Sequence, residues 1–191
     1  MKELHEYKDE ATEEVFRLEY RQSYHVASDL EEFDKWRRGE STAADDPEND
    51  YFQALRSLRD RRVRAMRVRI VDFPVGEYLL YELDFYRQSV SYGEDIRLLE
   101  RALAIDCMQS SVESQDFWLF DTSVVLIWKY TDEGERGGQE EISDPAAASR
   151  FVALRDCLLA HAMPIDQFVE RYSESFAAAR ESSRPRPPTP T

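Results

Sequence analysis

The sequence predicts an α/β fold, with α+β as the alternative, built on a mixed sheet of about four to five strands. Residues 64–71 alternate apolar and basic side chains, residues 77–91 show helical spacing, and Ile96–Leu99 again has the character of a strand. This order forms a βαβ unit, so its two strands should be parallel. The apolar runs Phe117–Phe120 and Val124–Trp128 predict a hairpin whose strands are covered on both faces and lie centrally in the sheet.

Residues 1–62 are predicted to be helical. Apolar side chains recur at spacings of three and four from Leu4 to Leu18, which indicates a long first helix with an acidic outer face. A second, short helix is expected around Leu30 to Trp36. A third should begin after Asp46-Pro47, because aspartate caps helices and proline fits the first helical position.

Residues 63–131 are predicted to form the sheet. In its first strand, apolar residues alternate with Arg67 and Arg69, which predicts one buried face and one polar face. The segment 131–141 is rich in glycine and glutamate, so a surface loop is expected there.

Residues 143–181 are predicted to be C-terminal helices, the first beginning at Asp144-Pro145 and the last restarting at Pro164. We expect residues 1–181 to form a single α/β domain. The proline-rich segment 182–191 cannot pack a core, so a disordered tail is expected there.

The charge balance limits the classes of partner. The chain has 39 acidic and 25 basic residues, which gives a formal net charge of -14. Because nucleic-acid binding depends on neutralising phosphates with lysine and arginine, direct nucleic-acid binding is not expected. The first residues are charged rather than apolar and no apolar run approaches the length of a membrane helix, so we expect a cytoplasmic protein that does not enter a membrane.

The sequence contains no motif that assigns a catalytic residue, a metal or a cofactor. The patterns HExxH, GxSxG, the P-loop and CxxC are all missing. Cys107 and Cys157 lie beside apolar residues and lack metal-ligand spacing, which favours two buried free thiols.

Carboxylates near the predicted strands are the best candidates for chemistry, because α/β folds build ligand sites at strand ends and oxygen ligands can hold Mg²⁺. The alternative is that these acids make local hydrogen bonds in turns. The set is Asp72, Glu82, Asp84, Glu94, Asp95, Asp116 and Asp121.

One basic cluster stands out in this acidic chain. It could bind an acidic partner, but pairing of Arg67 and Arg69 with acidic residues of the same chain is favoured. The cluster consists of Arg56, Arg59, Arg61, Arg62, Arg64, Arg67 and Arg69. The candidate contacts with a ligand or partner are Arg67, Arg69, Glu82, Glu94, Asp95, Asp116 and Asp121.

The stretch from Arg67 to Asp121 resembles an actinobacterial family known only as a domain of unknown function. The resemblance rests on these segments: Arg67-Val68-Arg69-Ile70-Val71, Pro74, Tyr78-Leu79, Tyr81-Glu82-Leu83, Gly93-Glu94-Asp95-Ile96-Arg97-Leu98 and Asp116-Phe117-Trp118-Leu119-Phe120-Asp121. Members are often encoded beside helix-turn-helix regulators, which implies a regulatory or accessory role. No catalytic residue follows from the resemblance.

Three hypotheses of function follow. The first is a non-enzymatic regulatory protein whose acidic surface binds a protein partner with a basic surface, such as a helix-turn-helix regulator. The second is an enzyme acting on a small molecule or nucleotide through the strand-end carboxylates and Mg²⁺. The third is an antitoxin or immunity-type protein, which relies on the same acidity.

Overall fold

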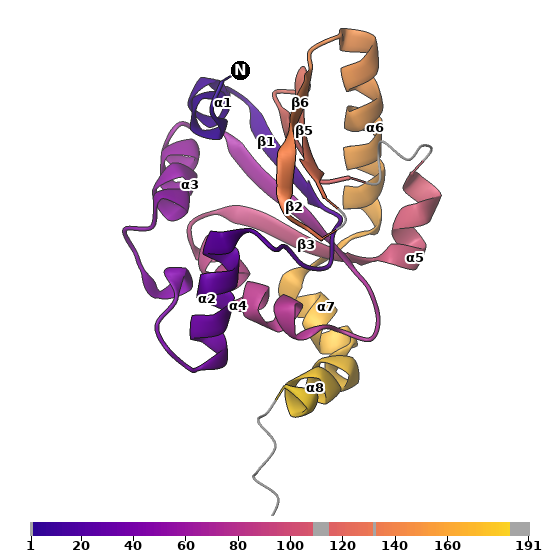
Figure 1. Cartoon of the computed structure of the whole chain (residues 1–191). Helices are drawn as coiled ribbons and strands as arrows, with labels where there is room; N and C mark the ends of the chain where they lie inside the picture. The colour runs from indigo at the N-terminus through magenta and orange to yellow at the C-terminus, as the bar shows by residue number, and fades with distance from the viewer. Residues whose placement is uncertain (1, 109–114, 132, 184–191) are drawn as a thin grey trace, which may run out of the picture.

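A seven-stranded mixed sheet forms the centre of the computed structural model (Figure 1). The structure describes residues 2–108, 115–131 and 133–183. The strands are β1 (Glu14–Glu19), β2 (Arg64–Val71), β3 (Glu94–Glu100), β4 (Phe117–Phe120), β5 (Val124–Tyr130), β6 (Arg136–Ile142) and β7 (Met163–Pro164). They lie in the order β6-β5-β4-β1-β2-β3-β7. The inner strands β1, β2 and β3 are parallel, and the remaining pairings are antiparallel.

Helices cover both faces of the sheet (Figure 1). One face packs against α5 and α6 through a core that includes Phe16, Val68, Phe117 and Phe151. The other face packs against the remaining helices. The helices are α1 (Leu4–Glu10), α2 (Ala27–Arg37), α3 (Asp50–Asp60), α4 (Glu77–Ser91), α5 (Arg101–Ala104), α6 (Pro145–His161), α7 (Ile165–Arg171) and α8 (Ser173–Ser182), with 3₁₀ turns η1 (Ala43–Asp45) and η2 (Ile105–Cys107).

The predicted α/β class and its two main motifs are confirmed. Strands β2 and β3 are parallel and are joined by α4, as expected of a βαβ unit. Strands β4 and β5 form the predicted hairpin, and β4 lies between β5 and β1 with all four residues buried. The turn is made by Asp121 and Thr122, both with positive φ, a conformation that suits tight hairpins.

The sheet has more strands than the four to five predicted. Strand β1 lies within the segment predicted as one long helix, because α1 ends at Glu10 and the chain is extended from Ala11. Strand β6 lies in the predicted surface loop and is a largely exposed edge strand, so it lacks the apolar alternation that marks a strand. The short strand β7 adds a further edge beside β3.

The C-terminal helices follow the sequence pattern in part. Helix α6 begins at Pro145, and the Asp144 carboxylate accepts a 2.8 Å hydrogen bond from the Ala147 N–H, as expected of a capping residue. The last predicted helix is divided at Tyr172 into α7 and α8. From residue 184 onward, the predicted disordered tail lies outside the described residues.

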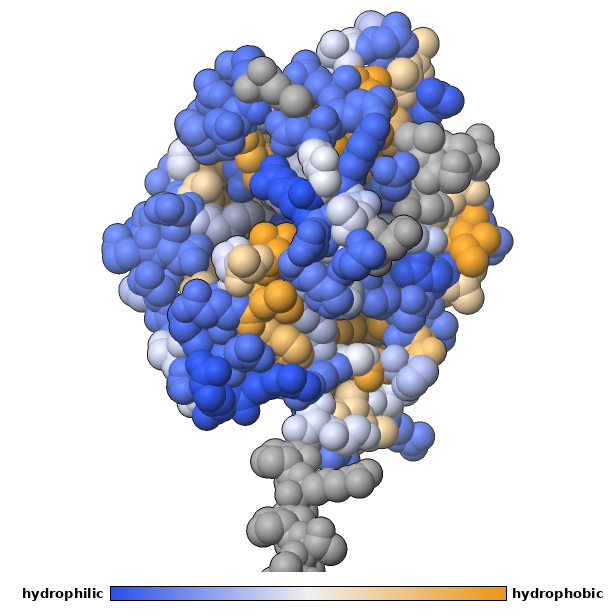
Figure 2. Space-filling view, in the orientation of Figure 1, coloured by the Kyte–Doolittle hydropathy of each residue, from blue (hydrophilic) through white to orange (hydrophobic). Residues whose placement is uncertain are grey.

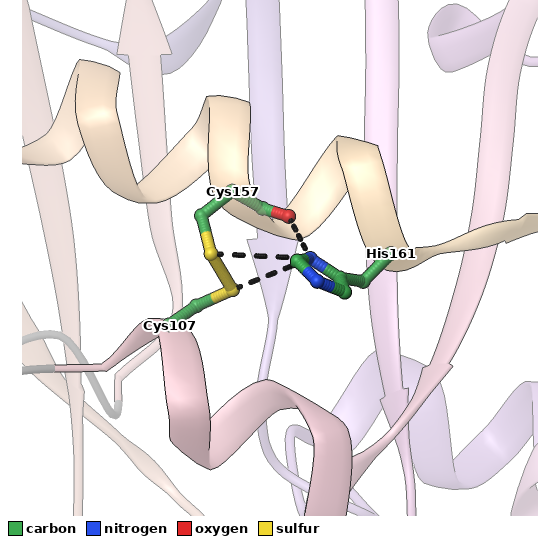
Figure 3. Close-up of a disulfide and its surroundings, with 3 residues drawn as sticks. All are labelled: Cys107, Cys157 and His161. Atoms are coloured by element: carbon green, nitrogen blue, oxygen red, sulfur yellow. Dashed lines mark hydrogen bonds between the residues drawn. A yellow bond between two sulfur atoms is a disulfide. The ribbon is translucent and has the colours of Figure 1, made fainter.

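The expectation of two free thiols was wrong. Cys107 on η2 and Cys157 on α6 form a disulfide across 50 residues of sequence (Figure 3). The apolar neighbours of each cysteine indicated burial but carried no information about which residues the fold brings together.

Candidate functional site

Charged side chains gather on one face of the three parallel strands. Arg17 in β1 is paired in register with Arg67 in β2, and Glu19 is paired with Arg69. Since residues paired in register point to the same face of a sheet, these four side chains lie together. The polar face predicted for β2 is therefore real, but it is buried beneath helices rather than exposed to solvent, with Arg67 and Arg69 at 2% and 0% exposure.

Arg67 is the centre of this arrangement. Its Nε donates a 2.9 Å hydrogen bond to Glu94 on β3, and its Nη1 donates a 3.1 Å hydrogen bond to Glu19. Nη2 contacts the hydroxyl of Tyr51 on α3. Through this guanidinium, β2 is joined to β1, β3 and α3.

Arg69 forms the second buried pair. Its Nη2 lies 2.7 Å from a carboxylate oxygen of Glu82, which is supplied by α4. Its guanidinium also donates to the backbone carbonyls of Arg21 and Gln22, directly after β1. We call Arg17, Glu19, Arg67, Arg69, Glu82 and Glu94 the ion network.

The ion network contains three arginines and three glutamates, so its formal charges balance. Burial alone would raise the pKa of Glu19, but Arg17, Arg67 and Arg69 lower it below its ordinary value. Burial raises the pKa of Glu82, and Arg69 opposes this shift. Glu19 therefore has the lower pKa of these two acids and is the more strongly ionised.

A cavity of about 330 Å³ lies between the ion network and helices α2, α3 and α4. Its inner wall is already hydrogen bonded: Tyr86 donates a 2.6 Å hydrogen bond to Glu19, and Tyr51 donates a 3.0 Å hydrogen bond to Glu94. The cavity is lined by Arg17, Glu19, Tyr24, Ser28, Asp29, Glu32, Ala43, Asn49, Tyr51, Arg67, Tyr78, Tyr81, Glu82, Phe85 and Tyr86.

Four side chains in the cavity keep unused capacity for binding. Within the described part of the chain, Arg17 forms an ion pair only with Glu19, at 2.8 Å, and Asp29 forms no ion pair. Burial raises the pKa of Asp29, and Arg17 opposes this shift, so the two side chains influence each other electrostatically. The hydroxyls of Tyr78 and Tyr81 also have no hydrogen-bond partner among the described residues.

The elements around the cavity explain how these groups are placed. Tyr78, Tyr81, Glu82 and Phe85 recur at spacings of three and four in α4, so they share one face of that helix. Helix α2 supplies Asp29 and has no buried residue. It forms an outer wall of the cavity, and Figure 2 shows hydrophobic residues exposed among hydrophilic ones on this side of the molecule.

The predicted carboxylate set is dispersed rather than gathered into one site. Glu82 and Glu94 join the ion network, on different arginines. Asp95 pairs with Arg97 at the surface, at 2.9 Å. Asp72 pairs with Arg101, and Asp84 accepts a 2.9 Å hydrogen bond from the Trp36 indole.

The other two acids of the set bind backbone groups that are distant in sequence, rather than making the local hydrogen bonds of the alternative interpretation. Asp116 accepts hydrogen bonds from the N–H groups of Tyr20 and Arg21 at 2.8 and 3.1 Å, and from the Tyr24 hydroxyl. Asp121 accepts hydrogen bonds from three consecutive N–H groups that begin at Thr12. Nowhere in residues 2–108, 115–131 and 133–183 do three carboxylates lie close enough to share an ion.

The arginines of the basic cluster also bind different parts of the chain, rather than forming one basic surface. Besides the buried Arg67 and Arg69, Arg61 donates hydrogen bonds to the carbonyls of Lys8, Asp9 and Ala11, which fixes the end of α1. Arg64 pairs with Glu14. These arginines therefore hold the fold together, and pairing within the chain is the correct interpretation for Arg67 and Arg69.

Sequence reasoning missed Arg17, Glu19 and Asp29. The signal for the first two was present: Arg17 and Glu19 are spaced by two, like Arg67 and Arg69, but the segment was assigned to a helix. No local pattern could place Asp29, because its position depends on how α2 packs over the sheet.

A second hollow, of about 530 Å³, lies at the carboxyl ends of the parallel strands. Its acid Asp116 is engaged by backbone N–H groups, and its Arg101 is paired with Asp72. Arg21 is the remaining charged residue there and forms no ion pair within the described ranges. This hollow therefore offers only the positive charge of Arg21. The cavity over the ion network offers both the positive charge of Arg17 and the negative charge of Asp29.

The fold and the site define a mixed α/β protein with a cavity lined by charged and aromatic side chains. The chain belongs to the family described as Domain of unknown function (DUF6879), whose model matches residues 2–170. A comparison with curated proteins finds no match. None of the helices in the described ranges has both the length and the apolar character that crossing a membrane requires.

Proposed function

We propose that this protein binds a small zwitterion of the size of an α-amino acid in the cavity over the ion network. The observation that carries the proposal is the pair of oppositely charged groups, Arg17 and Asp29, that line one cavity and are not paired with each other. A zwitterion satisfies both groups at once.

Arg17 is suited to the carboxylate of the ligand. A guanidinium has five donors in a planar fork, and Nη2 of Arg17 lies 2.8 Å from a carboxylate oxygen of Glu19. The side chain also stacks on Trp118, with the guanidinium carbon 5.0 Å from the ring centroid, which holds it in place. The remaining nitrogens can therefore bind a carboxylate without reorganising the ion network.

Asp29, Tyr78 and Tyr81 are suited to the ammonium group. A carboxylate attracts the charge, the tyrosine hydroxyls accept hydrogen bonds, and the ring faces favour a cation. The cavity volume of about 330 Å³ falls at the lower end of the range for small-molecule sites. Helix α2 has no buried residue, but its Phe33 and Trp36 pack against Tyr78 and Tyr81 of α4, and these aromatic contacts hold Asp29 beside the cavity.

Thermal unfolding in the presence of single L-amino acids tests this proposal. At least one amino acid should raise the midpoint, whereas propionate and propylamine, which carry one charge each, should not, because each leaves one group of the cavity unpaired. If no amino acid raises the midpoint, or if propionate alone has the same effect, the proposal is wrong.

We also propose that the acidic exterior binds a protein partner with a basic surface, as a regulatory or accessory protein would. The supporting observation is that the buried ion network balances three arginines with three glutamates, so the net charge of -14 is carried by the remaining residues of the chain. A helix-turn-helix regulator encoded beside the gene is the partner to test. The two proteins should co-elute at low salt and separate at high salt. Separate elution at low salt would exclude this partner.

A further inference from the structure

A sulfur- and nitrogen-rich cluster lies at the junction of η2 and α6, on the sheet face opposite the ligand cavity (Figure 3). The Nδ1 atom of His161 lies 3.9 Å from the Cys107 sulfur and 4.0 Å from the Cys157 sulfur. Cys157 and His161 are four residues apart on α6, which places them on the same side of that helix. Cys107 comes from a different element, so the fold itself assembles the cluster.

The three residues offer the donor set that zinc prefers. Two thiolates and an imidazole form a common coordination set for Zn²⁺, with water in the fourth position when no further ligand is present. The ligand atoms lie within 4.8 Å of one another, and this is the only such group of three among the residues that the structure describes. In a tetrahedral zinc site, ligand atoms lie roughly 3.5 to 3.8 Å apart, so the sulfur–nitrogen distances need to change by only a few tenths of an ångström.

We propose that the reduced form of this protein binds one zinc ion through Cys107, Cys157 and His161. The disulfide and the zinc site are then two alternative links between η2 and α6. Each joins the same two elements, so the reduced chain keeps a cross-link at this point when zinc is present.

A dithiol reagent supplies two electrons and two protons; the sulfur–sulfur bond breaks, two thiols form, and the reagent is oxidised to its own disulfide. Zinc binding then releases the two thiol protons to solvent. His161 Nδ1 lies 2.8 Å from the Cys157 carbonyl and donates a hydrogen bond to it. To coordinate zinc through Nδ1, the ring must carry its proton on Nε2 and give up that hydrogen bond.

The test is zinc binding by the full chain before and after reduction with dithiothreitol, followed by removal of the reagent under anaerobic conditions. The reduced protein should bind about one zinc ion per chain and the oxidised protein none, because a disulfide has no thiolate to offer. Cobalt(II) should give a thiolate-to-metal charge-transfer absorption in the reduced protein alone.

Two variants decide which residues are ligands. The double variant Cys107→Ser, Cys157→Ser should lose the charge-transfer band, and His161→Asn should raise the Kd for zinc by at least about tenfold while leaving two thiolates. His161 is exposed, so the second variant should fold even if the double variant does not. A folded, reduced wild type that binds no zinc, or an unchanged Kd in His161→Asn, would overturn the proposal.

Discussion

Arg67 and Glu94 form a buried ion pair in which the guanidinium Nε lies 2.9 Å from the carboxylate and each side chain is only 2% exposed. The pair joins the neighbouring strands β2 and β3 on the face covered by α3 and α4. Two buried charges are tolerated at this point because each is hydrogen bonded, Arg67 also to Glu19 and Glu94 also to Tyr51. Arg67 and Glu19 also line the cavity, so this part of its wall is held by buried ion pairs.

The variant Arg67→Met should lower the free energy of unfolding by about 3 to 5 kcal/mol, because it leaves Glu94 and Glu19 buried with less compensation. Adding Glu94→Gln should restore part of the loss, with a coupling of at least about 1 kcal/mol. Urea denaturation measures both. Arg97→Met is the matched control, because Arg97 pairs with Asp95 at the surface; a loss as large in the control would contradict this account.

Lys8 provides a test that depends on pH. It is 7% exposed, with its Nζ 4.4 Å from the centroid of the Tyr51 ring. Burial lowers its pKa from 10.5 to about 7, and the nearby positive Arg17 contributes to the shift. Between these two values the unfolded chain binds a proton that the folded chain lacks, so this residue makes stability rise with pH in that window and makes a constant contribution below it.

Lys8→Met should therefore stabilise the protein at pH 7 by about 2 to 4 kcal/mol, since methionine fills a similar space without a charge to desolvate. The gain should fall below about 1 kcal/mol at pH 10, near the ordinary pKa of lysine. Urea denaturation of both proteins at the two pH values measures the difference. An equal gain at pH 7 and pH 10 would show that packing, rather than protonation, is responsible.

Asp121 should be structural rather than catalytic. Its carboxylate accepts hydrogen bonds of 2.8 to 3.0 Å from the N–H groups of Thr12, Glu13 and Glu14, where the chain passes from α1 to β1. Asp121→Ala should destabilise the protein by about 2 to 3 kcal/mol, because these donors lose a charged acceptor. Asp95→Ala, a control at an exposed ion pair, should change stability by less than about 0.5 kcal/mol. Equal midpoints for the two variants would exclude this role.

The sequence contains enough local information for most of the fold. The alternation around Arg67, the helical spacing in α4 and the Asp144 cap each report on their own element, and each prediction was correct. Strand β1 was missed because Val15 and Leu18 also satisfy a helical spacing that begins at Leu4, and only pairing with β2 and β4 selects the strand.

The site was harder to predict than the fold because its residues come from separate elements. The alternation around Arg67 could not reveal that helices cover both faces of the sheet. Glu82 and Glu94 join the ion network, and their partners are set by strand register and by the packing of α4. The placement of Arg17 and Asp29 in one cavity depends on the position of α2, which no periodicity specifies.

The most direct test is isothermal titration calorimetry with the L-amino acid that raises the unfolding midpoint most. Arg17→Met and Asp29→Asn should each raise its Kd by at least about tenfold, because each removes the partner of one ligand charge. The controls Arg38→Met and Asp34→Asn change the same charges at exposed positions on or beside α2 and should leave the Kd unchanged. Equal affinity in the wild type and in both cavity variants would contradict the proposed site.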